Sequence, residues 1–322
     1  MTEPAARDLH VFTIPLRTRF RDIDVRHGVL FRGAAGWAEF SPFGEYDDDE
    51  AASWWAAAVE AADVGWPPAI RNRVPVNATV PAVPPAEVAG VLARFPGCRT
   101  AKVKVAQPGQ SRAEDQDRLA AVRELLGPAG RIRIDVNGRW DLDTAALLLP
   151  HYDRAAGGLE YAEQPCVATE DLAALRRRVT VPIAADESIR RSRDPARIAR
   201  LGAADVAVLK VQPLGGIRAC LRIAADIGIP VVVSSALETS VGIAAGVALA
   251  AALPELPFDC GLATAALLSR DVVARPLLPA AGTLSVRRPI VDPAALAATR
   301  ADEATTARWR DRVQRVARLA LA

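Results

Sequence analysis

Eight short β-rich runs, each followed by a segment with helical spacing, constrain the fold of this chain more than any other feature. The runs lie at residues 74–80, 101–106, 131–137, 158–165, 181–187, 204–211, 230–236 and 256–263. Strands that alternate with helices form parallel βαβ units, and eight such units in succession close into a barrel. We therefore predict an α/β fold with a (β/α) barrel of about eight strands, a modified TIM barrel.

Polar side chains stand at the ends of most of these runs. Six such residues and then a glycine follow one another at intervals of 31, 28, 23, 24, 24 and 27 residues: Lys104, Asp135, Glu163, Asp186, Lys210, Ser234 and Gly261. One strand and one helix fit each interval. Because the active site of a barrel lies where the carboxyl ends of its strands meet, we expect these residues to converge there.

The N-terminal residues have a different pattern, with apolar stretches at residues 11–16, 28–31 and 36–40 around an arginine-rich segment at residues 17–26. This pattern predicts a small antiparallel sheet with a polar loop. Residues 51–62 have helical spacing and follow an acidic run, which suits a helix N-terminus. A small α+β unit is therefore expected.

The last part of the chain contains prolines and a final helix around residues 304–321, which we expect to return to the N-terminal unit. The predicted organisation is a capping α+β domain of residues 1–73, completed by residues 275–322, and a barrel domain of residues 74–274. A chain of 322 residues is long enough for both.

Charge and composition exclude several classes of partner. The 40 basic and 38 acidic residues are spread along the chain and give a formal charge of +2, so no basic face for nucleic acid or anionic lipid is expected. The longest apolar stretch, residues 241–253, is short for a membrane span. Four separated cysteines and an N-terminus without an apolar leader favour a reduced, cytoplasmic protein with a small-molecule partner.

Three of the strand-end residues are carboxylates on consecutive strands, Asp135, Glu163 and Asp186. Crowded carboxylates repel one another unless a cation neutralises them, and an all-oxygen set suits Mg²⁺ better than Zn²⁺. Any one of the three would also serve as a helix N-cap or a loop carboxylate. Because all three are in phase with the barrel, we predict that they bind Mg²⁺, with Mn²⁺ as a substitute.

Lysines end two of the other strands. Lys102 and Lys104 are two residues apart, so the strand period places both side chains on one face, in the barrel mouth. At about 7 Å and an effective dielectric near 20, two ammonium groups repel by roughly 2 kcal/mol, enough to lower one lysine pKa toward the range of a general base. Lys210 ends a later strand, where it would face this pair across a ligand. The alternative is that these lysines are solvated or ion-paired.

The distribution of lysine supports a chemical role. Of the 40 basic residues only those at 102, 104 and 210 are lysines, and all three stand at predicted strand ends. Arginine keeps its proton, whereas a desolvated ammonium group can release one. A metal that binds a carboxylate, lysines that move a proton and a closed pocket together specify abstraction of a proton alpha to a carboxylate.

The motifs AKVKV, IDVNGRW, LEYAEQP, IAADES and LKVQPLGG occur in this order. With them the chain resembles the enolase superfamily over nearly its whole length, and the lysine-x-lysine strand and the later lysine resemble its muconate-lactonizing subgroup. The resemblance implies a capped barrel, a metal at the three carboxylates and acid–base chemistry by lysine.

Within that subgroup, the segments SSALETSVGIAAGVALAAALP and CGLATAALL look like the seventh and eighth strand regions of short actinobacterial o-succinylbenzoate synthases. Dipeptide epimerases carry an aspartate-x-aspartate pair at the eighth strand, whereas Asp259 is followed here by Cys260 and Gly261. The resemblance implies a lyase that performs syn dehydration of 2-succinyl-6-hydroxy-2,4-cyclohexadiene-1-carboxylate to 2-succinylbenzoate, a step toward menaquinone.

The same resemblance implies individual roles. Lys104 would remove the alpha proton and then assist loss of the hydroxyl, because both leave from one face. Lys210 would stay cationic on the other face, and Lys102 would tune Lys104. The loop around Arg19 and Arg21 would close over the ligand, although solvated surface arginines suit these positions equally well.

Several neighbouring residues carry smaller expectations. Asn137 and Gln164 border the predicted metal ligands and would orient them. A last set, at the ends of strands seven and eight, would bind the succinyl tail through hydroxyl and backbone groups, or only make strand-end hydrogen bonds. These residues are Ser234, Ser235, Gly261 and Leu262.

The sequence leaves two other functions open. An N-acylamino acid racemase, or another epimerase or cycloisomerase of the superfamily, would use Lys104 and Lys210 as bases on opposite faces. The second alternative is a binding protein that kept the barrel without turnover, and the intact set of carboxylates and lysines speaks against it.

Overall fold

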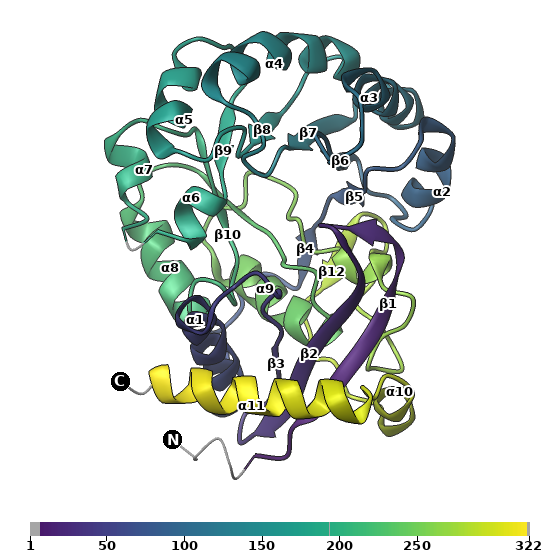
Figure 1. The fold of residues 1–322 in the computed structure, drawn as a ribbon, viewed down its shortest axis with the longest axis vertical. Coiled ribbons are helices and arrows are strands. Elements are labelled where there is room, and N and C mark those ends of the chain that lie inside the picture. The colour runs from purple at the N-terminus through teal and green to yellow at the C-terminus, as the bar shows by residue number, and fades with distance from the viewer. Residues whose placement is uncertain (1–6, 193, 321–322) are drawn as a thin grey trace.

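The computed structural model describes residues 7–192 and 194–320. A ring of strands surrounded by helices forms one part, and a three-stranded sheet with two helices forms the other (Figure 1). The strands are β1 (His10–Phe20), β2 (Ile23–Gly33), β3 (Gly36–Phe40), β4 (Arg73–Pro75), β5 (Ala78–Val80), β6 (Thr100–Lys104), β7 (Arg131–Asp135), β8 (Tyr161–Glu163), β9 (Ile183–Ala185), β10 (Val206–Leu209), β11 (Val231–Val233) and β12 (Thr283–Ser285). The helices are α1 (Asp48–Val59), α2 (Val88–Leu92), α3 (Arg112–Leu126), α4 (Leu142–Ala156), α5 (Thr169–Arg176), α6 (Glu187–Arg190), α7 (Arg197–Arg200), α8 (Ile217–Asp226), α9 (Ser240–Ala252), α10 (Pro293–Ala298) and α11 (Glu303–Leu319).

The barrel closes through a very short eighth segment. Strands β5 to β11 form a 7-stranded sheet in sequence order, and its pairs are parallel. Cys260 bridges Val76 beside β5, and Gly261 bridges Ser234 at the end of β11, both in parallel. The prediction of a (β/α) barrel of about eight strands is confirmed, with the eighth reduced to these two residues.

The prediction of a single strand over residues 74–80 is wrong. This segment divides into β4, which pairs antiparallel with β12, and β5, which belongs to the barrel. Pro75 ends β4, and because proline has no backbone N–H it cannot donate to a continuous ladder.

Burial explains why the barrel strands read as apolar runs. Every residue of β6, β8, β9, β10 and β11 is buried, as expected for a parallel sheet covered by helices. Helix α9 is buried along nearly its whole length, which accounts for the long apolar stretch in the sequence. Among the described residues, no helix combines the length and the apolar character that crossing a membrane requires.

The N-terminal sheet has the antiparallel order β1-β2-β3. The predicted polar loop at residues 17–26 is wrong, because β1 and β2 continue to a turn at Arg21 and Asp22. Both turn residues have left-handed backbone, with φ of 52° and 61°. Strand alternation therefore continues through the arginine-rich segment and turns Arg26 inward, where it is 2% exposed.

The C-terminal residues return to this sheet, as predicted. Helix α11 lies beside α1, with an ion pair of 2.6 Å between Arg315 Nε and Asp48 Oδ2 (Figure 1). The N–H of Thr13 on β1 donates to the carbonyl of Thr299 at 2.8 Å. Leu321, the last residue of the predicted final helix, lies outside the described residues, and the domain boundaries at residues 73 and 274 stay a prediction.

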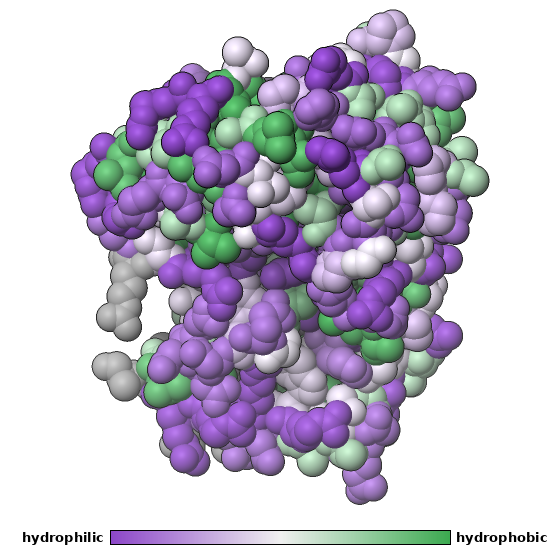
Figure 2. Space-filling view, turned by 45° about the horizontal axis from the view of Figure 1, so that its top comes forward, coloured by the Kyte–Doolittle hydropathy of each residue, from purple (hydrophilic) through white to green (hydrophobic). Residues whose placement is uncertain are grey.

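The molecular surface carries no dominant apolar patch on the face in Figure 2. Hydrophobic residues there form small groups among hydrophilic ones.

Candidate active site

The predicted strand-end residues converge inside the barrel. Register pairs Lys104 of β6 with Asp135 of β7, and Asp135 with Glu163 of β8. Asp186 directly follows β9, and Lys210 directly follows β10. The six side chains are buried, with residue exposures of 7% or less: Lys102, Lys104, Asp135, Glu163, Asp186 and Lys210.

Ammonium groups bridge the first two carboxylates. Lys102 Nζ donates to both oxygens of Glu163, at 2.9 and 3.1 Å, and lies 3.3 Å from Asp135 Oδ2. Lys104 Nζ donates to the same Asp135 oxygen at 2.7 Å. Asp135 therefore shares its charge between two lysines, and Glu163 pairs with one.

The two neighbouring lysines have opposite pKa shifts. Burial lowers the pKa of Lys104, and the charge of Lys102 lowers it further, against the opposing effect of Asp135. Burial would also lower the pKa of Lys102, but the carboxylates of Glu163 and Asp135 outweigh it and raise that pKa above its ordinary value. The structure thus favours Lys104 as the lysine that loses its proton more readily.

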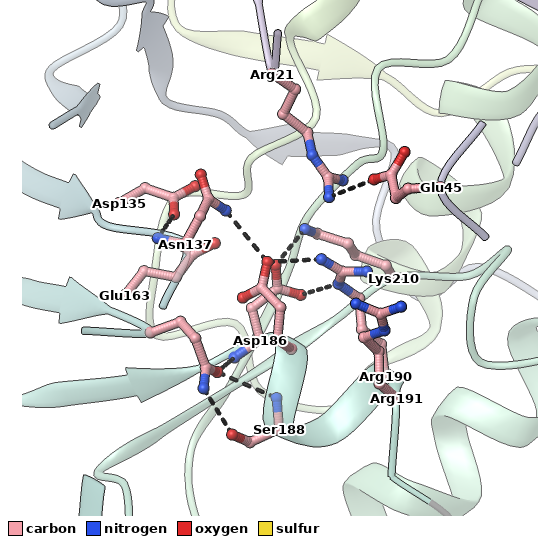
Figure 3. A network of polar contacts seen from close by, with 12 residues as sticks. Arg21, Glu45, Asp135, Asn137, Glu163, Asp186, Ser188, Arg190, Arg191 and Lys210 are labelled. Carbon is pink, nitrogen blue, oxygen red and sulfur yellow. Dashed lines mark hydrogen bonds and ion pairs between the residues drawn. The ribbon is translucent and has the colours of Figure 1, made fainter. Parts of the chain in front are cut away.

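A second group of charges surrounds Asp186 (Figure 3). Lys210 Nζ donates to Asp186 Oδ2 at 2.6 Å, and Arg190 Nε donates to Oδ1 at 3.1 Å. Arg190 also donates to Glu187 Oε1 at 2.6 Å. Burial and the charge of Asp186 raise the pKa of Glu187 to about 7. Glu187 and Arg190 were not among the residues predicted from the sequence, although both belong to the short helix that starts directly after Asp186.

The two neighbours of the predicted metal ligands act on them through hydrogen bonds. The N–H of Asn137 donates to Asp135 Oδ1 at 3.2 Å, and Asn137 Oδ1 accepts from Lys104 at 2.6 Å. Gln164 Oε1 accepts from the backbone N–H of Asp186 at 2.9 Å. Asn137 therefore contacts a carboxylate and a lysine, whereas Gln164 holds the backbone that carries Asp186.

A small pocket lies between these residues and the N-terminal sheet. Its volume is about 20 Å³, which is room for about one water molecule, so side chains must move before an organic ligand can enter. Lys102, Lys104, Asp135, Asn137 and Lys210 line one side. The other lining residues are Phe20, Arg21, Phe43, Thr79, Ser234, Ser235, Ala236, Leu237, Gly261 and Thr264.

Of the four strand-end residues predicted to bind the substrate tail, three line the pocket and one does not. Ser234, Ser235 and Gly261 line the pocket. Leu262 is completely buried and is not part of the lining, because its side chain packs against Gly246 of α9. Gly261 and Leu262 differ as strand alternation expects, whereas the adjacent Ser234 and Ser235 both line the pocket because β11 ends before them, at Val233.

The two predicted loop arginines also differ. Arg21 lines the pocket, stacks over Phe43 at 4.3 Å and pairs with Glu45 at 3.0 Å (Figure 3). Arg19 is exposed, pairs with Asp24 at 2.9 Å and does not line the pocket. Arg19 as it stands in the structure fits the alternative of a solvated surface arginine, and closure of this loop over a ligand stays a prediction.

A larger cavity of about 940 Å³ lies between β2 and α11, and none of the predicted site residues lines it. Two of its arginines already have partners, since Arg312 donates to the carbonyl of Tyr46 and Arg315 pairs with Asp48. Size alone therefore does not make it the better site, because it lacks the converging acid–base groups of the barrel mouth.

The carboxylate set fits a hard metal by donor type. Among the described residues, no three acidic, histidine or cysteine side chains already converge as a metal cluster, and Asp135, Glu163 and Asp186 pair with lysine and arginine. Their donors are nevertheless all oxygen atoms on consecutive strand ends. Glu187 adds a buried oxygen, Oε2, with no hydrogen-bond partner in the described structure. Oxygen donors of this kind suit Mg²⁺.

The fold and the site together define a capped (β/α)-barrel enzyme whose carboxylates and lysines meet at the strand ends. Residues 86–289 match the family described as enolase C-terminal domain-like, and residues 11–62 match enolase N-terminal domain-like. The chain belongs to the enolase superfamily. Enzymes of this superfamily use a divalent metal, typically Mg²⁺.

Several curated relatives are similar over nearly the whole chain. An o-succinylbenzoate synthase of Thermobifida fusca is 62% identical over 302 residues, which are 94% of this chain and 93% of the relative. Those of Mycolicibacterium smegmatis and Mycobacterium marinum are 56% and 54% identical, over 95% of this chain and 94% and 92% of their own lengths.

Solved structures agree with the fold. A muconate lactonizing enzyme from Pseudomonas fluorescens has a TM-score of 0.76 at 22% identity, covering 92% of this chain and 98% of its own. The L-Ala-D/L-Glu epimerase from Bacillus subtilis has a TM-score of 0.75 at 22% identity, covering 88% and 96%. At this identity the likeness concerns the fold alone.

Proposed function

We propose that this chain is an o-succinylbenzoate synthase, a lyase that dehydrates 2-succinyl-6-hydroxy-2,4-cyclohexadiene-1-carboxylate to 2-succinylbenzoate on the way to menaquinone. The observation that carries the proposal is the 62% identity to a synthase of the same name over 94% of the chain. The buried lysines and carboxylates at the barrel mouth supply groups that this reaction needs.

Lys104 is the proposed base and acid. Its lowered pKa makes the neutral amine easier to reach, and in that form Lys104 takes the proton alpha to the substrate carboxylate and becomes an ammonium group. The same ammonium group then gives a proton to the departing hydroxyl, which leaves as water while the ring becomes aromatic. One lysine serves both steps because both groups leave from one face.

Lys210 and Lys102 are proposed to act as cations. Lys210 extends from β10 and would place its charge on the opposite side of the substrate, where it stabilises the negative charge that develops on the carboxylate. Lys102 stays protonated beside Glu163, and its charge keeps the pKa of Lys104 low.

Asp135, Glu163 and Asp186 are proposed to hold Mg²⁺, with Mn²⁺ as a substitute. When bound, the metal supplies a Lewis acid and positive charge for the substrate carboxylate. Asn137 and Gln164 would keep two of these ligands in place, through the hydrogen bonds to Asp135 and to the backbone of Asp186.

The substrate tail is proposed to lie against Ser234, Ser235 and Gly261, with Arg21 near its carboxylate. Arginine suits such a group because its planar fork can donate two parallel hydrogen bonds. The proposed substrate is thus a small carboxylate. The cytoplasmic location expected from the sequence stays a prediction.

A racemase of N-acylamino acids is the second candidate. The observation in its favour is that Lys104 and Lys210 enter one pocket from different strands, each beside its own carboxylate. Transfer of solvent deuterium into a single enantiomer of an N-acylamino acid would reveal two bases at work.

An ultraviolet assay of purified protein with the cyclohexadiene carboxylate tests the proposed function. Loss of the diene should depend on Mg²⁺, stop with a chelator and disappear in the Lys104→Ala variant. No turnover by wild-type protein that is shown to be folded and metal-loaded would refute the synthase proposal.

A further inference from the structure

One wall of the pocket is a short segment between β11 and α9, residues 234–239, which we call the pocket segment. Its first four residues line the pocket. Leu237 has left-handed backbone, with φ of 62°, which costs a branched, non-glycine residue of order 1–3 kcal/mol. Such a conformation persists only where the surrounding structure holds it.

Arg26, from β2 of the N-terminal sheet, holds the middle of the pocket segment. Its Nε donates to the carbonyl of Leu237 at 2.9 Å, and Nη2 donates to the carbonyl of Ala236 at 3.2 Å. The same guanidinium donates to the carbonyls of Ser41 and His27 on its own side. One buried side chain therefore joins the sheet to the pocket wall.

Glu39, from the neighbouring strand β3, holds the helical end of the pocket segment. Its Oε2 accepts from the N–H of Thr239 at 3.1 Å, from the Thr239 hydroxyl at 2.5 Å and from the N–H of Gly242 at 3.0 Å. A carboxylate at this end also suits the positive end of the α9 dipole.

We propose that Arg26 is a positioning residue that sets the shape of the pocket wall at Ser234 to Leu237 and thereby the affinity for substrate, with Glu39 holding the same segment from its helical end. Arg26 itself is not part of the pocket lining, so it acts through the backbone that it binds. The proposal relies on the proposed function only for the identity of the ligand.

Arginine is needed at this position because of its geometry. The contacts to Ala236 and Leu237 come from one rigid fork, while the same group reaches the carbonyl of His27 on β2 and that of Ser41 just after β3. A lysine keeps the charge but has a single nitrogen, so it would leave some of these buried carbonyls without a donor.

Arg71 offers a matched control at the other end of the same helix. It donates to the carbonyls of Ala250, Leu253 and Pro254, and it does not line the pocket. Removing the Arg26 guanidinium takes two hydrogen bonds from backbone carbonyls beside the start of α9, and removing that of Arg71 takes three at its end. Only the loss at Arg26 affects the end of the helix that borders the pocket.

The test compares Arg26→Lys, Arg26→Met and Glu39→Gln with Arg71→Met. We expect KM, and the dissociation constant of 2-succinylbenzoate measured by calorimetry, to rise by about tenfold or more in the Arg26 variants while kcat changes by less than about threefold. Glu39→Gln should shift both in the same direction. Arg71→Met should lose stability toward urea with KM within about twofold of wild type.

Equal KM and product affinity in folded Arg26 and Arg71 variants would overturn the proposal and leave Arg26 a purely structural residue. If Arg26→Met does not fold, Arg26→Lys and Glu39→Gln decide the question. Amide hydrogen exchange adds a readout without ligand: exchange in residues 234–239 should speed up by about tenfold in Arg26→Lys and not in Arg71→Met. Wild-type protein that neither converts the diene nor binds the product would refute the proposed function, and the exchange result would then decide the positioning role alone.

Discussion

Separate exchange of Lys104 and Lys210 for arginine distinguishes a proton carrier from a fixed cation. Both lysines are buried, and each donates to one carboxylate, Lys104 to Asp135 at 2.7 Å and Lys210 to Asp186 at 2.6 Å. Arginine keeps the positive charge beside each carboxylate but does not release its proton. The same chemical change at two similar sites should therefore have unequal effects on kcat.

The expected magnitudes follow from the role assigned to each lysine. A positioned acid–base group contributes about 10²- to 10⁴-fold in rate, or roughly 2.7 to 5.4 kcal/mol at 1.36 kcal/mol for each factor of ten. Because Lys104 is assigned two proton transfers, Lys104→Arg should lose about 10⁴-fold or more. Lys210→Arg keeps its charge, and Asp186 retains a second donor in Arg190 at 3.1 Å, so misplacement alone should cost about 10- to 100-fold.

The assay is loss of the diene absorbance at saturating Mg²⁺, with circular dichroism to show that each variant is folded. A Lys104→Arg variant within tenfold of wild type would refute the assignment of the base, since about 10²-fold is the least that loss of the base should cost. Equal losses at Lys104 and Lys210 would refute the division of roles and support two bases on opposite faces, as in a racemase.

Four further predictions follow from individual contacts. Arg21→Ala should raise KM by about tenfold because Arg21 lines the pocket, whereas Arg19→Ala should change it by less than about twofold because its ion pair is exposed, and steady-state kinetics of the two variants checks both. Glu187→Gln should weaken Mg²⁺ binding by about 10- to 100-fold in calorimetry, and equal affinity would remove Glu187 from the metal surroundings. Chelation should abolish turnover, with recovery on addition of Mg²⁺ or Mn²⁺. Burial and Glu238 raise the pKa of Glu39 from 4.5 to about 7, so Glu39 should contribute a fall of about 3 kcal/mol in stability as pH rises from about 4.5 to 7, and the pH slope in urea unfolding should be shallower by that amount in Glu39→Gln.

The chemistry of the site could be predicted because the barrel converts sequence spacing into position. Each βα unit brings one strand end to the same face, so Asp135, Glu163 and Asp186 could be placed together from their intervals alone. Strand alternation likewise placed Lys102 and Lys104 side by side. The structure adds which carboxylate each lysine contacts. Burial and the charge of Lys102 lower the pKa of Lys104, and its one carboxylate partner, Asp135, does not offset them.

Other residues could not be found in this way. Arg26 falls in an arginine-rich segment that reads as a polar loop, and only its pairing in β2 turns it toward a segment 210 residues later. Glu39 reaches α9 across a similar separation, 200 residues. No local period encodes such contacts, because they depend on how the sheet docks against the barrel. Leu262 does not line the pocket for a local reason. It follows Gly261 by one residue, and adjacent residues of a strand turn to opposite sides.

The catalytic groups and the pocket wall are held by different parts of the molecule, and this division indicates where substrate specificity is determined. The groups proposed for proton transfer and metal binding come from the barrel strands and are buried among one another, so a change in any of them disturbs several charge pairs at once. The pocket wall is instead held by Arg26 and Glu39 from the N-terminal sheet, and their partners are mainly backbone groups. A change in the sheet can therefore reshape the pocket wall without altering the charges that perform the reaction. We expect substrate preference to be adjusted at the contacts between sheet and barrel, because changes there disturb the chemistry least.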